Sequence, residues 1–283
     1  MVDNKTKILI TGSTGFIGTS LCEILHENFV FVKGISRKEG DIRTLDLNNL
    51  GSFDQVIHLA NRNFIPDSWK NPGEFFSTNI DGTRNILEFC RKNKSRLIYV
   101  SAYVYGQPKY LPIDEKHFVN GLNPYMESKI IAERLVQFYA ENFNIPCVII
   151  RPFNIYGSNQ KLSFLIPTIV DQISSSETPS VHVRSLKPKR DFLHINDFNR
   201  ALLTVVNEKD LQGIYNIGYG QSFSVKEIIN TFSKILNKPI QYSEDDIDRP
   251  NEIIDVVADI SKIKADTNWK PEISLIEGLS QVL

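Results

Sequence analysis

The sequence predicts an α/β fold, with a doubly wound parallel sheet and a smaller C-terminal substrate domain. Two observations in the 283-residue chain carry this prediction. Short apolar runs of strand length alternate with longer stretches whose apolar residues follow helical spacing. Strands that are apolar throughout are typical of a parallel sheet covered by helices on both faces. In addition, a glycine-rich turn follows the first strand, at the edge where such sheets bind their ligands.

The glycine-rich turn lies within residues 7–18, KILITGSTGFIG, between an apolar strand and a helix. At such a turn, free N–H groups and the positive end of the helix dipole favour an anion. Gly12 would permit the tight turn, Gly15 would let a pyrophosphate approach the backbone, and Gly18 would let the helix pack closely on the strand. A structural alternative stays open, because glycines also cluster in turns that bind nothing.

The other elements follow from the same patterns. In the first half, strands are expected at residues 29–35, 54–60, 96–101 and 146–152, and helices at 75–93 and 124–142. In the second half, helices are expected at 164–174, 198–206, 224–236 and from 274 onward, and strands at 181–184, 191–195 and 213–218. Residues 240–242 and 261–267 are two further short elements. Ser224 and Glu227 are placed to form a capping box.

Two domains are expected from the point at which the alternating pattern loosens. Residues 1–157 with about 192–218 would form the dinucleotide-binding domain. Residues 158–191 with 219–283 would form the substrate domain, assembled from segments that leave the sheet and return to it.

The composition is that of an ordinary globular protein, with 41% hydrophobic and 23% charged residues. The net charge of −1 gives no basic excess that would favour nucleic acid or an acidic membrane. The first residues lack the apolar core of a signal peptide, and no apolar run is long enough to cross a bilayer. We therefore expect a cytoplasmic protein without a nucleic-acid or membrane partner. The three distant cysteines are expected as reduced thiols, and the five scattered histidines predict no metal site.

Tyr125 and Lys129 are candidates for catalysis, because residues four apart share one face of a helix. A tyrosine normally titrates at ~10. A nearby ammonium group lowers that pKa, which would make Tyr125 a general acid or base. Ser101 ends a predicted strand, where its hydroxyl could hydrogen-bond a carbonyl or alkoxide beside Tyr125. A surface Tyr–Lys pair and an ordinary turn serine are the structural alternatives.

These residues belong to a series of motifs that runs over nearly the whole chain. The motifs are TGSTGFIG at 11–18, DL at 46–47, HLA at 58–60, NIDGTRN at 79–85, VSAYVYG at 100–106, YMESK at 125–129, RPFNIYG at 151–157, RDFLHINDF at 190–198, YNIG at 215–218 and VADISKIKADTNWKP at 257–271. In this order and spacing, the chain resembles the extended short-chain dehydrogenases/reductases of the nucleotide-sugar epimerase, dehydratase and reductase group. The resemblance implies a Rossmann sheet.

The resemblance also implies roles for individual residues. Ser101, Tyr125 and Lys129 would form the catalytic triad, and Tyr125 and Lys129 would also contact the cofactor. The rest of the cofactor site would comprise Gly12, Thr14, Gly15, Phe16, Ile17, Asp46, Leu47, Leu59, Ala60, Asn61, Phe153 and Ile155. The diphosphate of a nucleotide-linked sugar would be held by Asn154, Arg190 and Arg249. For Arg249, a solvated surface charge is the alternative. A homodimer through the helices at 75–93 and 124–142 is implied as well.

Two departures from family patterns narrow the function. The 4,6-dehydratases carry Asp-Glu after the catalytic hydroxyl residue, where this chain has Ala102 and Tyr103, so a dehydratase is not expected. An acidic residue at the end of the second strand would bind the ribose 2′-hydroxyl of NAD. This chain has Ser36, Arg37 and Lys38 there, which suit the 2′-phosphate of NADP. A basic loop without cofactor contact is the alternative.

The leading hypothesis is an NADPH-dependent reductase of a nucleotide-linked 4-keto-6-deoxysugar. Ser101 would polarise the sugar carbonyl, and Tyr125 would donate a proton to the developing alkoxide. The close alternative is a nucleotide-sugar 4-epimerase that uses the same triad and tightly bound NAD. A non-catalytic NAD(P)-binding regulatory or scaffold protein is the alternative from another class, although such proteins usually lose a triad residue. The nucleotide, the sugar and the product stereochemistry stay open.

Overall fold

The computed structural model describes residues 6–29, 31–175, 179–245 and 252–283. Its centre is a six-stranded parallel sheet with the strand order β2–β1–β3–β4–β5–β9. These strands are β1 (Lys7–Thr11), β2 (Phe31–Ile35), β3 (Gln55–His58), β4 (Arg96–Val100), β5 (Cys147–Pro152) and β9 (Gly213–Ile217). The strand order reverses between β1 and β3, where sheets of this kind bind ligands. The predicted doubly wound α/β fold is confirmed.

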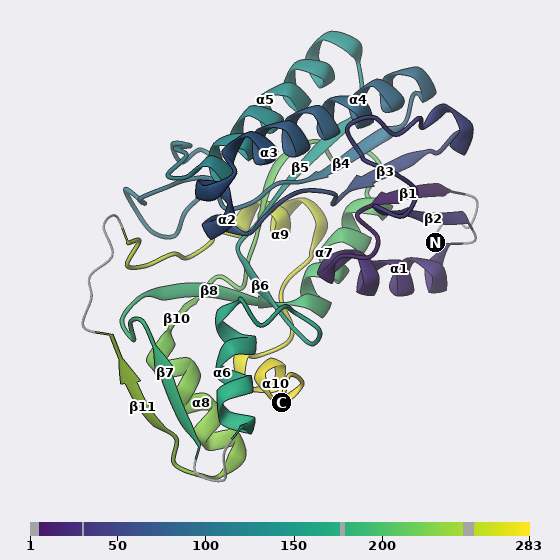
Figure 1. Cartoon of the computed structure of the whole chain (residues 1–283). Coiled ribbons are helices and arrows are strands. Elements are labelled where there is room, and N and C mark those ends of the chain that lie inside the picture. The colour runs from purple at the N-terminus through teal and green to yellow at the C-terminus, as the bar shows by residue number, and fades with distance from the viewer. Residues whose placement is uncertain (1–5, 30, 176–178, 246–251) are drawn as a thin grey trace.

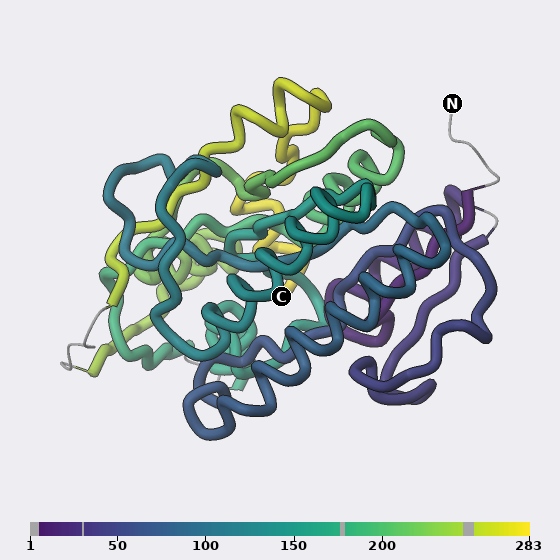
Figure 2. Tube along the Cα trace, turned by 90° about the horizontal axis from the view of Figure 1, so that it is seen from above, coloured from purple at the N-terminus to yellow at the C-terminus, as the bar shows by residue number. Residues whose placement is uncertain are grey.

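Helices cover both faces of the sheet (Figure 1). On one face, α1 (Phe16–Asn28) packs against α7 (Ile195–Asn207). On the other face, α4 (Gly82–Asn93) and α5 (Pro124–Phe143) run side by side (Figure 2). The short helix α9 (Ser261–Thr267) packs beside β9.

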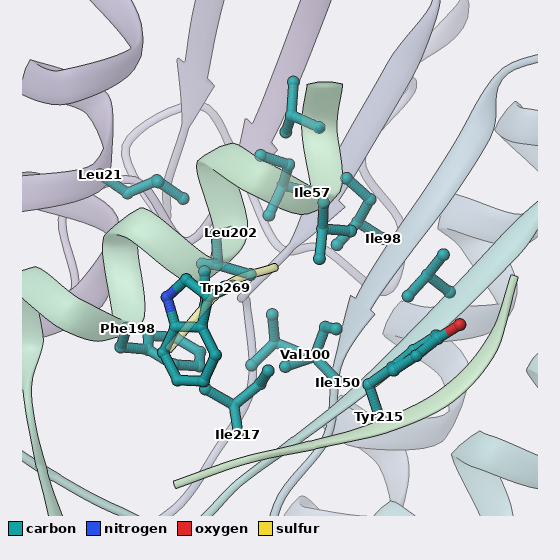
Figure 3. Close-up of a cluster of buried hydrophobic side chains, with 14 of the residues drawn as sticks. Leu21, Ile57, Ile98, Val100, Ile150, Phe198, Leu202, Tyr215, Ile217 and Trp269 are labelled. Carbon is teal, nitrogen blue, oxygen red and sulfur yellow. The ribbon is translucent and has the colours of Figure 1, made fainter. Parts of the chain in front are cut away.

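The buried strands supply two cores, because successive side chains point to opposite faces of the sheet. In β1, Ile8 and Ile10 join the core beneath α1 and α7, whereas Leu9 joins the core beneath α4 and α5. Figure 3 shows the first of these cores, in which Phe198 of α7 and Trp269 lie against the strands. Burial on both faces explains why the strands are apolar throughout.

The second half of the chain adds a smaller group of elements, seen at the lower left of Figure 1. A three-stranded sheet has the order β10–β8–β6, and β7 pairs in parallel with β11. The elements are β6 (Asn154–Tyr156), α6 (Leu165–Ser174), β7 (Ser180–Val183), β8 (Lys189–His194), β10 (Ser222–Ser224), α8 (Val225–Leu236), β11 (Gln241–Glu244) and α10 (Leu275–Ser280). They share a core of their own, separate from the two cores of the large sheet. The division into a dinucleotide-binding and a substrate domain stays a prediction.

The main differences from the expected elements concern short segments. The expected helix 75–93 consists of α3 (Pro72–Phe76), a π-helical turn η2 (Ser77–Asp81) and α4. The strands β6 and β10, the helix α2 (Ile65–Lys70) and the turn η1 (Asn48–Leu50) were not predicted. These segments are too short to show a hydrophobic period. The capping box of Ser224 and Glu227 is confirmed at the start of α8.

The described ranges contain neither a membrane-spanning helix nor a cluster of metal-ligand side chains. None of the helices there is long and apolar enough to span a bilayer. In the same ranges, no cluster of three or more His, Cys, Asp or Glu side chains could hold a metal ion.

Candidate active site

Three glycines shape the turn between β1 and α1, and they differ in backbone conformation and in the space that a side chain would have. Gly12 has φ of +72°, and a Cβ there would stand 2.8 Å from the backbone nitrogen of Ala60. A Cβ on Gly18 would stand 2.8 Å from Cα of Ser13, so this glycine packs against the turn itself. Gly15 directly precedes α1, and a Cβ there would meet only the Gly12 carbonyl oxygen, at 3.2 Å. Gly15 thus leaves open a backbone cradle at a helix N-terminus, which fits a pyrophosphate.

His58 fixes the end of β3 beside this turn. Its Nδ1 lies 2.6 Å from Oγ1 of Thr11, and its Nε2 lies 3.2 Å from Oγ1 of Thr83. The Thr83 hydroxyl donates to the carbonyl oxygen of Asn79 at 2.6 Å, so it accepts from His58, whose proton is therefore on Nε2. Burial lowers the pKa of His58 to about 3 and keeps the ring neutral. The motif HLA indicated this strand end, but not this structural role.

Asn79 connects the chain after β3 to helix α5. Its Oδ1 accepts from the backbone N–H of Arg62 at 2.8 Å, and its Nδ2 donates to the Arg62 carbonyl at 3.1 Å. The same Nδ2 donates to Oγ of Ser128, on α5, at 2.8 Å. Asn79 lies in the π-helical turn η2, a distortion that often marks functional sites. The segment with Leu59, Ala60 and Asn61 is thereby held at a fixed place relative to α5.

The three triad candidates come from β4 and α5. Ser101 directly follows β4, and its backbone N–H donates to the Ile150 carbonyl at 2.7 Å. Its buried hydroxyl oxygen has no hydrogen-bond partner among the described residues. Nζ of Lys129 donates to the carbonyl of Val100, next to Ser101, at 2.8 Å. Tyr125 lies one helical turn before Lys129 and packs beside Ala102. A polar hydroxyl left unsatisfied at this strand end is suited to bind a substrate oxygen.

Burial sets the protonation of this region. It lowers the pKa of Lys129 to about 7, an effect that the carboxylate of Glu133 opposes. The ammonium also stands 4.4 Å from the ring centroid of Tyr99. For Tyr125, burial raises the pKa well above its ordinary value. The expected lowering of this pKa by Lys129 is therefore wrong for this structure, because desolvation is the cause that acts on the phenol and it raises the pKa. The phenol of Tyr125 stays protonated at neutral pH.

A buried ion pair joins α5 to β5 near Lys129. It was not predicted, although its arginine belongs to the motif RPFNIYG. Arg151 of β5 donates from Nη2 to Oε2 of Glu133 at 2.5 Å and from Nε to Oε1 at 3.1 Å. Both side chains are 4% exposed. Nη1 of Arg151 donates to the Tyr105 hydroxyl at 3.0 Å. Since Glu133 is one helical turn after Lys129, Tyr125, Lys129 and Glu133 form one row along α5.

The loop after β2 is polar and exposed. The Ser36 backbone N–H and hydroxyl donate to the same oxygen of Glu39, at 2.6 and 3.0 Å. Arg37 and Lys38 are exposed beside them. These hydrogen bonds lower the pKa of Glu39. Glu39 was not among the predicted site residues, because it is three residues beyond the expected position for an acidic residue.

The remaining predicted residues lie at several places around the strand ends. Oδ1 of Asp46 accepts from the backbone N–H of Asn48 at 3.0 Å, and Leu47 is buried. Phe153 is buried among aromatic rings, and Ile155 packs on the core beneath α1 and α7. The others comprise exposed Thr14, half-buried Phe16, Ile17 and Asn154, and Arg190, whose Nη1 donates to the Ile253 carbonyl at 2.7 Å. Arg249 lies outside the described residues.

Comparison with known proteins identifies this arrangement. The sequence pattern of the NAD dependent epimerase/dehydratase family matches residues 8–218. The chain belongs to this family. Over 98% of its length, it is 33% identical to a putative UDP-glucose 4-epimerase of Methanocaldococcus jannaschii, 97% of which is covered. It is 28% identical, over 98% of its length and 96% of the relative's, to a GDP-6-deoxy-D-mannose reductase of Pseudomonas aeruginosa.

Solved structures of family members share the fold. The structure of RMD from Pseudomonas aeruginosa complexed with NADPH has a TM-score of 0.88 at 27% identity. A UDP-glucuronic acid 4-epimerase from Bacillus cereus, in complex with UDP-glucuronic acid and NAD, has a TM-score of 0.89 at 29% identity. Each comparison covers 98% of this chain and 97% of the other. The resemblance to extended short-chain dehydrogenases/reductases is confirmed, and the protein is an NAD(P)-dependent enzyme of this class.

Proposed function

We propose that this enzyme reduces a nucleotide-linked 4-keto-6-deoxysugar with NADPH. The observation that supports this direction is the half-buried phenol of Tyr125, whose pKa desolvation raises and which packs against the cluster that contains Ala102, next to the unsatisfied hydroxyl of Ser101. Reduction of a carbonyl begins with a proton donor, whereas oxidation of a sugar alcohol begins with a base. The GDP-6-deoxy-D-mannose reductase relative and the NADPH complex support the same direction.

Each residue of the site would have its own role in the reaction. A nicotinamide cofactor, bound at the glycine turn, supplies the hydride. Ser101 donates a hydrogen bond to the sugar carbonyl oxygen and polarises it. Tyr125 donates its proton to the same oxygen as negative charge develops there. Lys129 holds the cofactor ribose and, when protonated, stabilises the phenolate that Tyr125 becomes. Asn154 and Arg190 would bind the diphosphate of the substrate, and Arg249 is proposed for the same role.

The positions after Ser101 support consumption of a ketosugar rather than its production. Ala102 has no polar group, and the hydroxyl of Tyr103 donates to the Gly106 carbonyl at 2.6 Å. The Tyr103 ring packs edge-on against Phe153, with 5.5 Å between the centroids. Tyr103 therefore fills an aromatic cluster instead of supplying the carboxylate that elimination of water requires.

The second candidate is a nucleotide-sugar 4-epimerase. The 33% identical relative and the Bacillus cereus structure with NAD favour it. An epimerase oxidises the sugar, turns it in the pocket and reduces it from the other face, so it needs the same three side chains and no net cofactor.

The two functions differ in cofactor consumption. Absorbance of NADPH is followed with a nucleotide-linked 4-keto-6-deoxyhexose, and interconversion of nucleotide-linked glucose and galactose is followed without added cofactor. Stoichiometric loss of NADPH is expected from the reductase, and Ser101→Ala serves as the inactive control. Interconversion without net change in cofactor would establish the epimerase instead.

A homodimer in the cytoplasm is proposed for the assembled enzyme. At the end of α5, Phe138 and Phe143 have exposed fractions of 52% and 45%, and pairing of α4 and α5 with a second copy would bury such an apolar surface. Light scattering at micromolar concentration measures the mass directly. A monomeric mass would contradict the dimer.

A further inference from the structure

The C-terminal end of β2, which leads directly into the loop with Ser36 and Glu39, touches the glycine turn. The backbone N–H of Ser13, in the turn, donates to the carbonyl of Ile35 at 3.1 Å. A Cβ on Gly34 would stand 2.6 Å from Cβ of Ser13, so β2 and the turn are in close contact. A cofactor whose pyrophosphate lies at the turn would therefore place its adenosine ribose within reach of residues 36–39.

Within this loop, a carboxylate already occupies the donors that an anion would use. One oxygen of Glu39 accepts from both the N–H and the hydroxyl of Ser36. The Ser36 hydroxyl oxygen in turn accepts from the N–H of Lys38 at 3.2 Å. The N–H and the hydroxyl of Ser36 thus hold a single internal anion, and the charge of Lys38 acts on the same carboxylate. Arg37 is exposed in the same loop. A ribose 2′-phosphate presents oxygens of the same kind to such donors.

We propose that Glu39 determines cofactor selectivity, because its carboxylate competes with the 2′-phosphate of NADP for the donors of Ser36. For NAD, the same carboxylate accepts a hydrogen bond from the ribose 2′-hydroxyl. NADPH binds only when Glu39 leaves Ser36, and Arg37 and Lys38 then neutralise the phosphate. Glu39 therefore narrows the preference for NADPH that the two cations create. This inference rests on the cofactor placement of the proposed function.

A purely structural role for Glu39 makes a different prediction. If the carboxylate only stabilises the turn at Ser36, its loss loosens the loop and weakens both cofactors alike. If it competes with phosphate, its loss strengthens NADPH and weakens NADH, so the two affinities move in opposite directions. The sign of the change separates the two roles.

The experiment measures NADPH and NADH binding by isothermal titration calorimetry, without sugar substrate. Glu39→Gln, which keeps the size of the side chain, is expected to tighten NADPH about fivefold and to weaken NADH severalfold. Glu39→Ala should likewise tighten NADPH binding and weaken NADH binding. Asp41→Asn is the matched control, because this substitution removes the same charge from the same segment. The Asp41 carboxylate accepts from Nη2 of Arg43, at 2.6 Å, rather than from Ser36. The control should leave the ratio of the two affinities nearly unchanged.

Arg37→Ala distinguishes failure of this inference from failure of the cofactor placement. If Arg37→Ala changes the ratio of affinities and Glu39→Gln does not, or if Glu39→Gln weakens both cofactors equally, the role of Glu39 is overturned. If neither variant changes the ratio, the loop does not contact the cofactor, and the placement fails together with this inference. An equal change in Asp41→Asn would show a general charge effect and would also overturn the specific role.

Discussion

The row of ionisable side chains on α5 and the loop after β2 carry similar groups in opposite environments. Lys129 and Glu133 are buried, and burial lowers the pKa of Lys129 to about 7. Glu39 and Asp41 are exposed, and hydrogen bonds hold the pKa of each carboxyl below its ordinary value. In the first region desolvation determines protonation, whereas in the second region local donors do.

This difference separates two tasks of the proposed reductase, which are proton transfer to the substrate and recognition of the cofactor. Proton transfer benefits from a dry site, where a phenol stays protonated until charge develops on the substrate. Recognition of the cofactor benefits from an exposed loop, whose hydrogen bonds can be exchanged at little cost. Variants in the two regions should therefore differ in what they change: stability and turnover on α5, and cofactor affinity in the loop.

The largest effect is expected from the buried ion pair. Glu133→Gln leaves the guanidinium of Arg151 buried without its countercharge, which should lower the free energy of unfolding by about 3–5 kcal/mol. Urea denaturation measures the change. Glu88→Gln on α4 is the matched control, because its pair with Arg91 is exposed and should contribute at most about 1 kcal/mol. Equal losses in the two variants would show that burial of the pair is unimportant.

The second-largest effect is expected from removal of the Tyr125 hydroxyl, the proposed proton donor. Tyr125→Phe should lower turnover by ~10²-fold or more and leave cofactor affinity and thermal stability nearly unchanged. Tyr139→Phe, on the same helix, is the control, since its hydroxyl donates to Glu88 at 2.7 Å, away from the triad. Wild-type turnover in Tyr125→Phe would remove Tyr125 from the catalytic role.

In the exposed loop, Arg37→Ala should weaken NADPH by about ten- to a hundredfold, the value of a charge-assisted contact to phosphate. NADH lacks the 2′-phosphate and should bind almost as before. Fluorescence titration of both cofactors tests this prediction. Equal affinity of the wild-type enzyme for NADPH and NADH would already contradict it.

The smallest effect, counted per pH unit, is expected in the pH dependence of the free energy of unfolding, measured by comparing Lys129→Met with the wild type. The pKa of Lys129 is about 7 in the fold and 10.5 ordinarily, so between these values the unfolded chain binds more protons. Wild-type stability should therefore rise with pH in this window, by up to about 1.4 kcal/mol per pH unit. The stability of the methionine variant relative to wild type should fall by the same amount. A difference that is independent of pH would mean that Lys129 is not desolvated.

Much of this architecture could be predicted, because its signals are local in the sequence. The turn at Gly12 and Gly18, the strand end at Ser101 and the spacing of Tyr125 and Lys129 each occupy one short segment. The lowered pKa expected for Tyr125 was wrong, because burial depends on packing that the helix pattern does not specify.

Contacts between distant segments could not be predicted. Glu133 and Arg151 meet only because α5 lies over β5, and the bond between Asn79 and Ser128 joins two separate helices. Glu39 bonds Ser36, the residue at the position where an acidic side chain was expected, although it is three residues further along the chain. In each case, the missing information is the relative placement of elements, not the identity of the residues.

The central claim is net transfer of hydride to the sugar, and isotope tracing tests it most directly. NADPH that carries deuterium at C4 of the reduced nicotinamide is incubated with the enzyme and a nucleotide-linked 4-keto-6-deoxyhexose, and the products are analysed by mass spectrometry. The account predicts one deuterium at C4 of the product sugar for each NADPH oxidised, and almost none with Tyr125→Phe. A sugar that changes configuration without gaining deuterium, while NADPH stays constant, would contradict it.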